Sequence, residues 1–206
     1  MTKQLCIAAL VIFGMLRSNA QDSGDIELGF GAGLNVSNVT AQEGASGTPS
    51  RYSFNIGVSG EYYFSDRWGL KVELIYDNKG WADGFIEDNN ANSITTDYEV
   101  NYATLPFMAN WHFGSNRNWY LNFGPYIGFL VKAEATESDL NVKDGFKSTD
   151  FGLAFGIGYK FELDDNIKLF IEYDGQSGFT DVFENNRGSA VRNGRSSFNI
   201  GALFSL

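Results

Sequence analysis

The sequence contains no run of about 20 apolar residues, the length that a membrane-spanning helix requires, so a helical membrane span is excluded. It has 3 prolines, 1 cysteine (Cys6) and 1 histidine (His112), so no cluster of histidine and cysteine ligands can hold a metal. Basic residues are few, with 15 Lys and Arg against 25 Asp and Glu. The resulting net charge of -10 argues against a nucleic-acid partner, which needs a basic surface.

Glycine and aromatic residues are abundant, with 24 glycines and 16% Phe, Trp and Tyr. Between residues 151 and 163 every odd position is apolar and every even position is small or charged, which is the pattern of a strand with two different faces. Asp164, Asp165 and Asn166 then predict a turn, and residues 167–173 predict a second strand. A tilted strand crosses a bilayer with about 9–11 residues, so the first of these strands is long enough to span one.

The N-terminus has the features of a targeting segment. Lys3 supplies a positive charge, residues 5–16 are apolar, and residues 18–20 form a small-x-small cleavage site that ends at Ala20. The alternative is an apolar helix at the start of the mature domain. If residues 1–20 are a signal peptide, Cys6 is removed with them, and residues 21–206 form one domain without disulfide or thiolate.

The same alternation recurs along the chain and predicts eight strands, at about residues 26–36, 52–64, 68–77, 98–113, 119–133, 151–163, 167–173 and 196–206. Short connections at 65–67, 114–118 and 164–166 alternate with long ones at 37–51, 78–97, 135–149 and 175–195. In the fourth strand the apolar phase slips near residues 104–106, which predicts a β-bulge. The fold class that we expect is all-β, an antiparallel up-and-down barrel whose short turns lie at one end and whose long loops lie at the other.

The direction of the apolar face decides between two kinds of barrel. A soluble, lipocalin-type barrel would turn this face inward. The opposite face carries many glycines and charges of both signs, which suits a crowded lumen better than a surface. Aromatic residues also gather near the short turns (Phe64, Trp68, Phe113, Trp119, Phe161 and Phe204) and near the long loops (Tyr52, Tyr76 and Tyr98). Two aromatic belts are typical of a barrel that spans a bilayer, so we expect a transmembrane barrel in contact with lipid.

The C-terminus points to the outer membrane. Asn199, Gly201, Phe204 and Leu206 resemble the C-terminal signal that barrel assembly machinery reads, a polar residue and a glycine followed by alternate apolar residues. We therefore expect an eight-stranded transmembrane β-barrel in the cell outer membrane, with short periplasmic turns and long external loops.

Charged residues at interior phase are the first candidate site: Glu61, Lys71, Glu73, Lys132, Lys160, Glu162, Lys168 and Glu172. They can form an ion path or proton relay, or a neutralising network that fills a narrow lumen. We favour the network, because an eight-stranded barrel has just enough interior for its own side chains and buried charges must be paired. His112 is expected in the lumen near the short turns as a structural residue, so no catalytic residue, metal site or cofactor is expected.

The long loops supply the second candidate. Their acidic residues (Asp83, Glu87, Asp88, Glu137 and Asp139) match no calcium-binding loop, which favours a solvated surface. Trp81, Phe85 and Ile86 are apolar residues in a segment that we expect to be an exposed loop. They either extend the barrel rim or dock a partner protein.

Four segments carry a family resemblance: residues 70–80 (LKVELIYDNKG), 102–107 (YATLPF), 124–129 (GPYIGF) and 146–158 (FKSTDFGLAFGIG). They resemble the PorT-like outer-membrane β-barrel family, and the resemblance spans nearly the whole mature chain. It implies an eight-stranded barrel with a signal peptide, and a member of the family is associated with secretion across the outer membrane.

The expected function is that of a non-enzymatic outer-membrane barrel with a structural or accessory role, in contact with an export machine or another envelope protein. A narrow pore for ions or small solutes is the alternative, and a lipid-modifying enzyme is a more remote one.

Overall fold

The computed structural model describes residues 23–40, 48–87, 93–137 and 140–206. The expected signal peptide with Cys6 lies outside these residues, as do Asp88 and Asp139. The described part contains no helix of the length and apolar character needed to cross a membrane.

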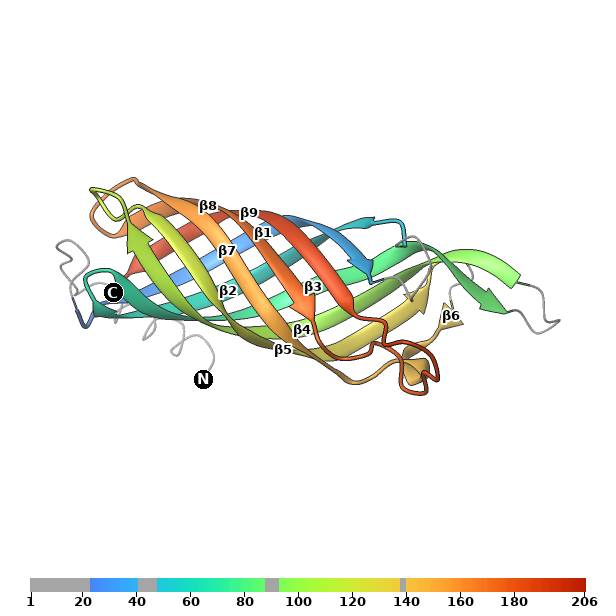
Figure 1. Cartoon of the computed structure of the whole chain (residues 1–206). Helices are drawn as coiled ribbons and strands as arrows, with labels where there is room; N and C mark the ends of the chain where they lie inside the picture. The colour runs from blue at the N-terminus through green and yellow to red at the C-terminus, as the bar shows by residue number, and fades with distance from the viewer. Residues whose placement is uncertain (1–22, 41–47, 88–92, 138–139) are drawn as a thin grey trace, which may run out of the picture.

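Eight long strands form a closed ring (Figure 1). They are β1 (Ile26–Val39), β2 (Arg51–Ser65), β3 (Trp68–Glu87), β4 (Ser93–Phe113), β5 (Trp119–Ala135), β7 (Thr149–Glu162), β8 (Ile167–Gly178) and β9 (Asn193–Ser205). Each pairs antiparallel with the next, and β9 pairs with β1 to close the ring. A two-residue strand, β6 (Leu140–Asn141), and a short 3-10 helix, η1 (Lys143–Gly145), lie in the loop between β5 and β7. The expected eight-stranded up-and-down barrel is confirmed.

The two faces of the wall differ as the alternation predicts. On β7, Phe151 and Phe155 are exposed on the outside, whereas Asp150 and Lys160 are buried inside. Within the ring, closure pairs each long strand on both sides, and no free sheet edge has to face lipid there. An apolar outer wall around a polar, side-chain-filled interior is the arrangement expected of a small membrane barrel.

The β3–β4 hairpin differs from the expectation. Residues 78–97 were expected to form a long loop, but β3 continues to Glu87 and β4 begins at Ser93. Figure 1 shows this hairpin, in green, extending beyond the other strands at the long-loop end. Paired side chains support it, since Trp81 lies opposite Tyr98 and Ile86 lies opposite Ile94. Turn-forming Asn and Asp residues suggested a loop, but these cross-strand apolar pairs extend the ladder.

The phase slip expected near residues 104–106 is absent. Every even position of β4 from Tyr98 to His112 is buried, so Tyr98, Val100 and Tyr102 face the interior. The irregularity lies in the neighbouring strand: Asn101 is paired with Lys132 and Tyr102 with Leu130, which leaves Val131 as an extra residue in β5. The apolar residues at the start of β4 face inward because the outer third of the barrel has an apolar interior, described below.

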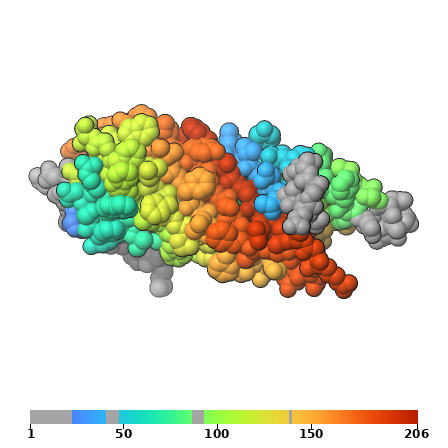
Figure 2. Space-filling view, in the orientation of Figure 1, coloured from blue at the N-terminus to red at the C-terminus, as the bar shows by residue number. Residues whose placement is uncertain are grey.

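Glycines let large interior side chains fit. The ring of Phe170 on β8 lies over Gly31 and Gly201, where an added Cβ would come within 2.8 Å and 2.4 Å of ring carbons. Gly80 has a second role, because its φ of 129° is one that other residues rarely adopt. The space-filling view shows the elongated body that results, with the short-turn end at the left (Figure 2).

Candidate functional site

The interior near the short turns holds a cluster of paired charges. Lys160 Nζ lies 2.5 Å from Glu27 Oε1 and 3.4 Å from Glu61 Oε2. Lys168 Nζ lies 2.9 Å from the other carboxylate oxygen of Glu27, and His112 Nε2 lies 2.6 Å from Glu61 Oε1. All five side chains are buried. Their charges balance within the cluster, which is what a buried group of ions needs to be tolerated.

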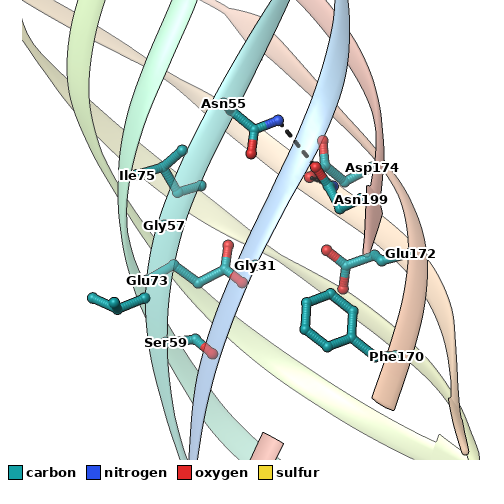
Figure 3. A pocket seen from close by; sticks show the side chains of 11 residues that line it. Gly31, Asn55, Gly57, Ser59, Glu73, Ile75, Phe170, Glu172, Asp174 and Asn199 are labelled. Carbon is teal, nitrogen blue, oxygen red and sulfur yellow. Dashed lines mark hydrogen bonds between the residues drawn. The ribbon is translucent and has the colours of Figure 1, made fainter. Parts of the chain in front are cut away.

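A second cluster lies in the middle of the lumen. Lys71 Nζ is 2.7 Å from Glu73 and 3.1 Å from Glu172, and Asn122 donates a hydrogen bond of 2.8 Å to Glu172. A cavity of about 30 Å³ adjoins these groups. Figure 3 shows carboxylates and amides from several strands pointing into it, among them those of Asn55, Glu73, Glu172, Asp174 and Asn199. Two further cavities measure about 10 Å³ each. Spaces of this size hold one or a few water molecules.

Further toward the long loops the pairing continues. Arg195 is ion-paired with Asp174, and its Nε lies 3.3 Å from Asp77. Lys79 Nζ lies 3.7 Å from Asp77 and 3.4 Å from Asp150. Asp150 also accepts hydrogen bonds from Tyr126 (3.0 Å) and Thr180 (3.0 Å), among others. Acidic and basic groups thus alternate along the lumen and tie opposite walls together.

An apolar cluster, called the outer cap here, fills the long-loop end of the interior. It consists of Val39, Trp81, Tyr98, Val100, Tyr102, Leu130, Ala133, Ala135, Phe146, Val182 and Val191. The Trp81 and Tyr98 rings stack with centroids 4.6 Å apart, and Phe146 packs on Phe183 at 5.2 Å. The loops after β5 and β8 are joined here, since Lys147 N donates to Val182 O at 2.9 Å. These loops therefore fold over the mouth of the lumen.

The structure brings most of the expected network residues into the interior: Glu61, Lys71, Glu73, Lys160, Lys168 and Glu172. The interior position expected for Lys132 is wrong. The extra residue Val131 reverses the phase of β5, so that Ala133 and Ala135 join the outer cap. Lys132 is 42% exposed and pairs with Glu134 at 2.7 Å. Glu162 is exposed at the last position of β7 and lies beyond the network.

Two basic residues of the lumen charge network were not predicted from the sequence. Lys79 and Arg195 fall in segments that were expected to be long loops, at 78–97 and 175–195. The signal was present in the alternation itself, because Lys79 continues the interior phase of Lys71 and Asp77, and Arg195 continues that of Asn199. If the inward–outward alternation of each strand is continued into the polar segment beside it, both residues fall at interior positions.

The expected aromatic girdle lies on the outer wall at the short-turn end, with Phe64, Trp68, Phe113, Trp119, Phe161 and Phe204 exposed or half-exposed. Trp111 and Tyr159 join it: Trp68 stacks on Trp111 at 6.2 Å, and Trp119 contacts Tyr159 edge-on at 5.0 Å. Near the long loops Tyr52 and Tyr76 are exposed as expected. Tyr98 is not part of that belt, because it is buried in the outer cap.

The expected docking residues separate into different environments. Trp81 is only 4% exposed and belongs to the outer cap, so its place in an exposed loop was wrong. Ile86 packs partly against the same cap, whereas Phe85 is 70% exposed. A docking surface on this hairpin is therefore centred on Phe85.

Hydrogen bonds hold Glu137, one of the acidic residues of the long loops, in place. Glu137, just after β5, accepts hydrogen bonds from the Asp97 amide (2.9 Å), the Thr96 hydroxyl (2.8 Å) and the Thr136 hydroxyl (2.9 Å). These donors, the Asp97 amide foremost, lower the pKa of Glu137 to about 2. Among the residues that the structure describes, no group of three or more His, Cys, Asp or Glu side chains is arranged to hold a metal ion.

Comparisons with known proteins agree with this architecture. The family described as "Outer membrane protein beta-barrel domain" matches residues 19–184. The chain is similar to the outer membrane protein OprG from Pseudomonas aeruginosa, with a TM-score of 0.53 and 13% identity over 91% of this chain and 98% of that one. The N-terminal β-barrel domain of OprF from the same organism gives 0.51 and 15%, over 90% and 100%. These identities show a shared fold. No curated protein matches the sequence.

Proposed function

Because the chain belongs to the outer membrane protein β-barrel domain family, we propose that it is a non-enzymatic integral outer-membrane barrel with a structural or interaction role. The observation that carries the proposal is the filled interior. The interior cavities described above measure about 30 Å³ or less, the buried charges around them are paired, and the outer cap fills the long-loop end. A path for solutes needs a continuous opening, so this interior supports a scaffold rather than a narrow pore.

The external end is the part that we propose to contact other proteins. The β3–β4 hairpin extends beyond the rest of the barrel, and Phe85 is exposed on it. A large apolar side chain on a projecting, cap-anchored hairpin is a suitable anchor for a protein partner. The resemblance to PorT-like barrels extends this proposal to an accessory role in export across the outer membrane.

The proposal includes the route to the membrane. Residues 1–20 act as a signal peptide cleaved near Ala20, and the C-terminal strand is read by the barrel assembly machinery. In the folded barrel Phe204 is exposed on the outer wall, and Leu206 N donates to Ile26 O at 2.9 Å. The assembly signal would therefore be read before β9 pairs with β1.

Site-specific photo-crosslinking in the outer membrane tests the interaction role. A photoreactive phenylalanine analogue replaces Phe85, and the control carries it at Phe155 on the lipid-facing wall. We expect one protein adduct of defined mass from position 85 and only lipid adducts from position 155. Absence of a protein adduct at position 85, with the barrel folded, would contradict the interaction role.

Two measurements address the other candidate functions. In planar bilayers we expect no single-channel steps from the folded barrel, and regular steps would support a pore instead. In cells that overproduce the protein we expect unchanged phospholipid and lipid A profiles. A new lipid species would support a lipid-modifying enzyme.

A further inference from the structure

A groove of about 480 Å³ lies on the outer wall of the barrel, where β1, β2, β8 and β9 meet. Large side chains border it, namely those of Leu34, Val36, Tyr52, Tyr173 and Phe198. Ser196 lies among them on the same outward face of β9. This volume falls within the range of about 300–1,000 Å³ that is typical of ligand-binding sites.

The groove exists because Ser196, a small residue, lies on the outward face of β9 among large side chains of the neighbouring strands. Ser196 on β9 is paired with Gly175 on β8, and Gly194 is paired with Ser177. Elsewhere on the same wall a small residue is isolated: Ala202 lies between Leu169 on β8 and Phe30 on β1. The ring of Phe155 on β7 lies over Gly175, so the low part of the wall is centred on Ser196, with the aromatic Tyr173 and Phe198 at its lower end.

The position of the groove indicates what covers it. It lies on the apolar outer wall, toward the long-loop end and far from the girdle at the short turns. Hydrocarbon of the outer leaflet surrounds this part of a barrel whose long loops are external. A flexible acyl chain can follow a furrow of this shape, whereas a small residue elsewhere on this wall, such as Ala202, is isolated between large side chains.

A positively charged residue, Arg192, lies next to the groove on the side of the long loops. Arg192 is exposed, and alternation from Ser196 through Gly194 places it on the same outward face. Its backbone is held to β1, because Arg192 N donates to Thr40 Oγ1 at 3.0 Å and Thr40 N donates to Arg192 O at 2.9 Å. Among the described outward-facing residues at the outer ends of β1, β2 and β9, Arg192 carries the only charge, and the nearby carboxylate of Asp181, after β8, accepts a hydrogen bond from the Val191 amide at 3.3 Å. A guanidinium in that position can bind a phosphate group in bidentate geometry.

We propose that the groove and Arg192 together bind one phosphate-bearing lipid of the outer leaflet. The acyl chain lies along Ser196 between Tyr52 and Tyr173, and the phosphate lies against Arg192. Arg192 is four residues from Ser196, roughly 13 Å along a strand, which leaves room for the linkage between headgroup and chain. This binding site is independent of the partner surface at Phe85.

Native mass spectrometry of the detergent-purified barrel with added palmitoyl-oleoyl-phosphatidylglycerol tests the proposal. Ser196→Phe fills the groove, and Ala202→Phe is the matched control, because it introduces the same side chain on the same strand and face. We expect the wild type and Ala202→Phe to retain one lipid, and Ser196→Phe to retain at least fivefold less. Arg192→Gln should lose the preference for phosphatidylglycerol over the uncharged palmitoyl-oleoyl-glycerol while still retaining lipid.

Heat-dependent mobility on a gel verifies that each variant is folded, and Ser196→Leu replaces Ser196→Phe if the latter fails this check. Equal retention by Ser196→Phe and Ala202→Phe would overturn the groove. Equal retention of the charged and uncharged lipids by the wild type would overturn the role of Arg192. Disulfide-linked dimers of Ser196→Cys in native membranes would overturn the proposal in favour of a second copy of the chain at this face.

Discussion

The ammonium group of Lys160 lies 2.5 Å from the carboxylate of Glu27, although 133 residues separate them in the sequence. Lys160 also donates to the Tyr63 hydroxyl at 2.7 Å and approaches Glu61. One cation from β7 thus joins two acids and a phenol on β1 and β2. The contact links opposite sides of the wall, so we expect the lumen network to determine the stability of the barrel.

Replacement of Lys160 by methionine tests this role. The change leaves Glu27 with Lys168 alone and removes the lysine that faces Glu61, so an excess of buried negative charge remains. Breaking a buried ion pair from one side costs about 3–5 kcal/mol, and we expect a loss of unfolding free energy of that size. The unfolding free energy is measured by urea unfolding in lipid vesicles, with the heat-dependent gel shift as the readout of the folded fraction.

Lys132→Met is the matched control, because Lys132 is a partly exposed lysine paired with Glu134 and Glu99. Exposed pairs contribute about 0–1 kcal/mol, so this variant should unfold like the wild type. Conductance in planar bilayers should be unchanged in both variants. If Lys160→Met kept its stability and altered conductance, the charges would form an ion path instead of a structural network.

The outer cap leads to a second prediction. Trp81 packs on Tyr98, Phe146 and Phe183, so Trp81→Ala removes a side chain of the β3–β4 hairpin that contacts both loops. Truncation of a buried aromatic residue to alanine costs about 3–5 kcal/mol, and we expect a loss in that range. Limited proteolysis should also cleave residues 179–192 faster.

The matched control for the cap is Phe85→Ala on the same hairpin, where the side chain is 70% exposed. An exposed substitution of this kind changes stability by about 0.5 kcal/mol or less. Equal protease sensitivity of the two variants would show that the loops do not depend on Trp81.

Gly80 provides a third prediction, at a single backbone position. A Cβ on Gly80 would lie 1.8 Å from the carbonyl oxygen of Tyr98, and its φ of 129° disfavours any other residue. Gly80→Ala should therefore destabilise the barrel by about 1–3 kcal/mol. Gly145→Ala is the control, because nothing lies within 4 Å of the Cβ position there. Thermal unfolding in detergent compares them, and equal transition temperatures would show that the Gly80 backbone relaxes without cost.

The sequence predicted the membrane-spanning part of the barrel well, for a physical reason. Lipid outside and paired polar groups inside impose a strict alternation, which β7 obeys from Phe151 to Phe161. That contrast weakens at the outer end, where apolar loop residues pack into the lumen. Tyr98 was therefore assigned to the lipid-facing belt, and Trp81 was assigned to an exposed loop because the segment around it is polar.

The remaining errors concern Lys132, which no local signal places, and Lys79 and Arg195, whose polar surroundings masked the alternation. The extra residue at Val131 shifts the phase of β5 and moves Lys132 out of the interior. Nothing in the local sequence marks it, because Ala133 is small enough for either face. Polar segments around Lys79 and Arg195 looked like loops, yet both residues pair with Asp77 inside the barrel.

Glu137 leads to a fourth prediction, on pH. Its pKa is lowered from 4.5 to about 2 by the Asp97 amide first and by the hydroxyls of Thr96 and Thr136. A carboxyl whose pKa is depressed on folding stabilises the folded state fully above its unfolded pKa, near 4.5, and loses that contribution as pH falls through about 2. The tie between β4 and the loop after β5 should therefore persist at pH 4 and release near pH 2.

The titration of the Asp97 amide resonance in bicelles measures this transition by NMR. In the wild type we expect a midpoint near pH 2, and in Thr96→Val, which lacks one of the donors, a midpoint shifted toward 4.5. Glu137→Gln should abolish the transition while the barrel stays folded, because the residue lies on the exposed rim. A wild-type midpoint at 4.5 would mean that the three hydrogen bonds do not persist in solution, and the loop after β5 would then be anchored by its backbone hydrogen bonds and by the apolar contacts of the outer cap.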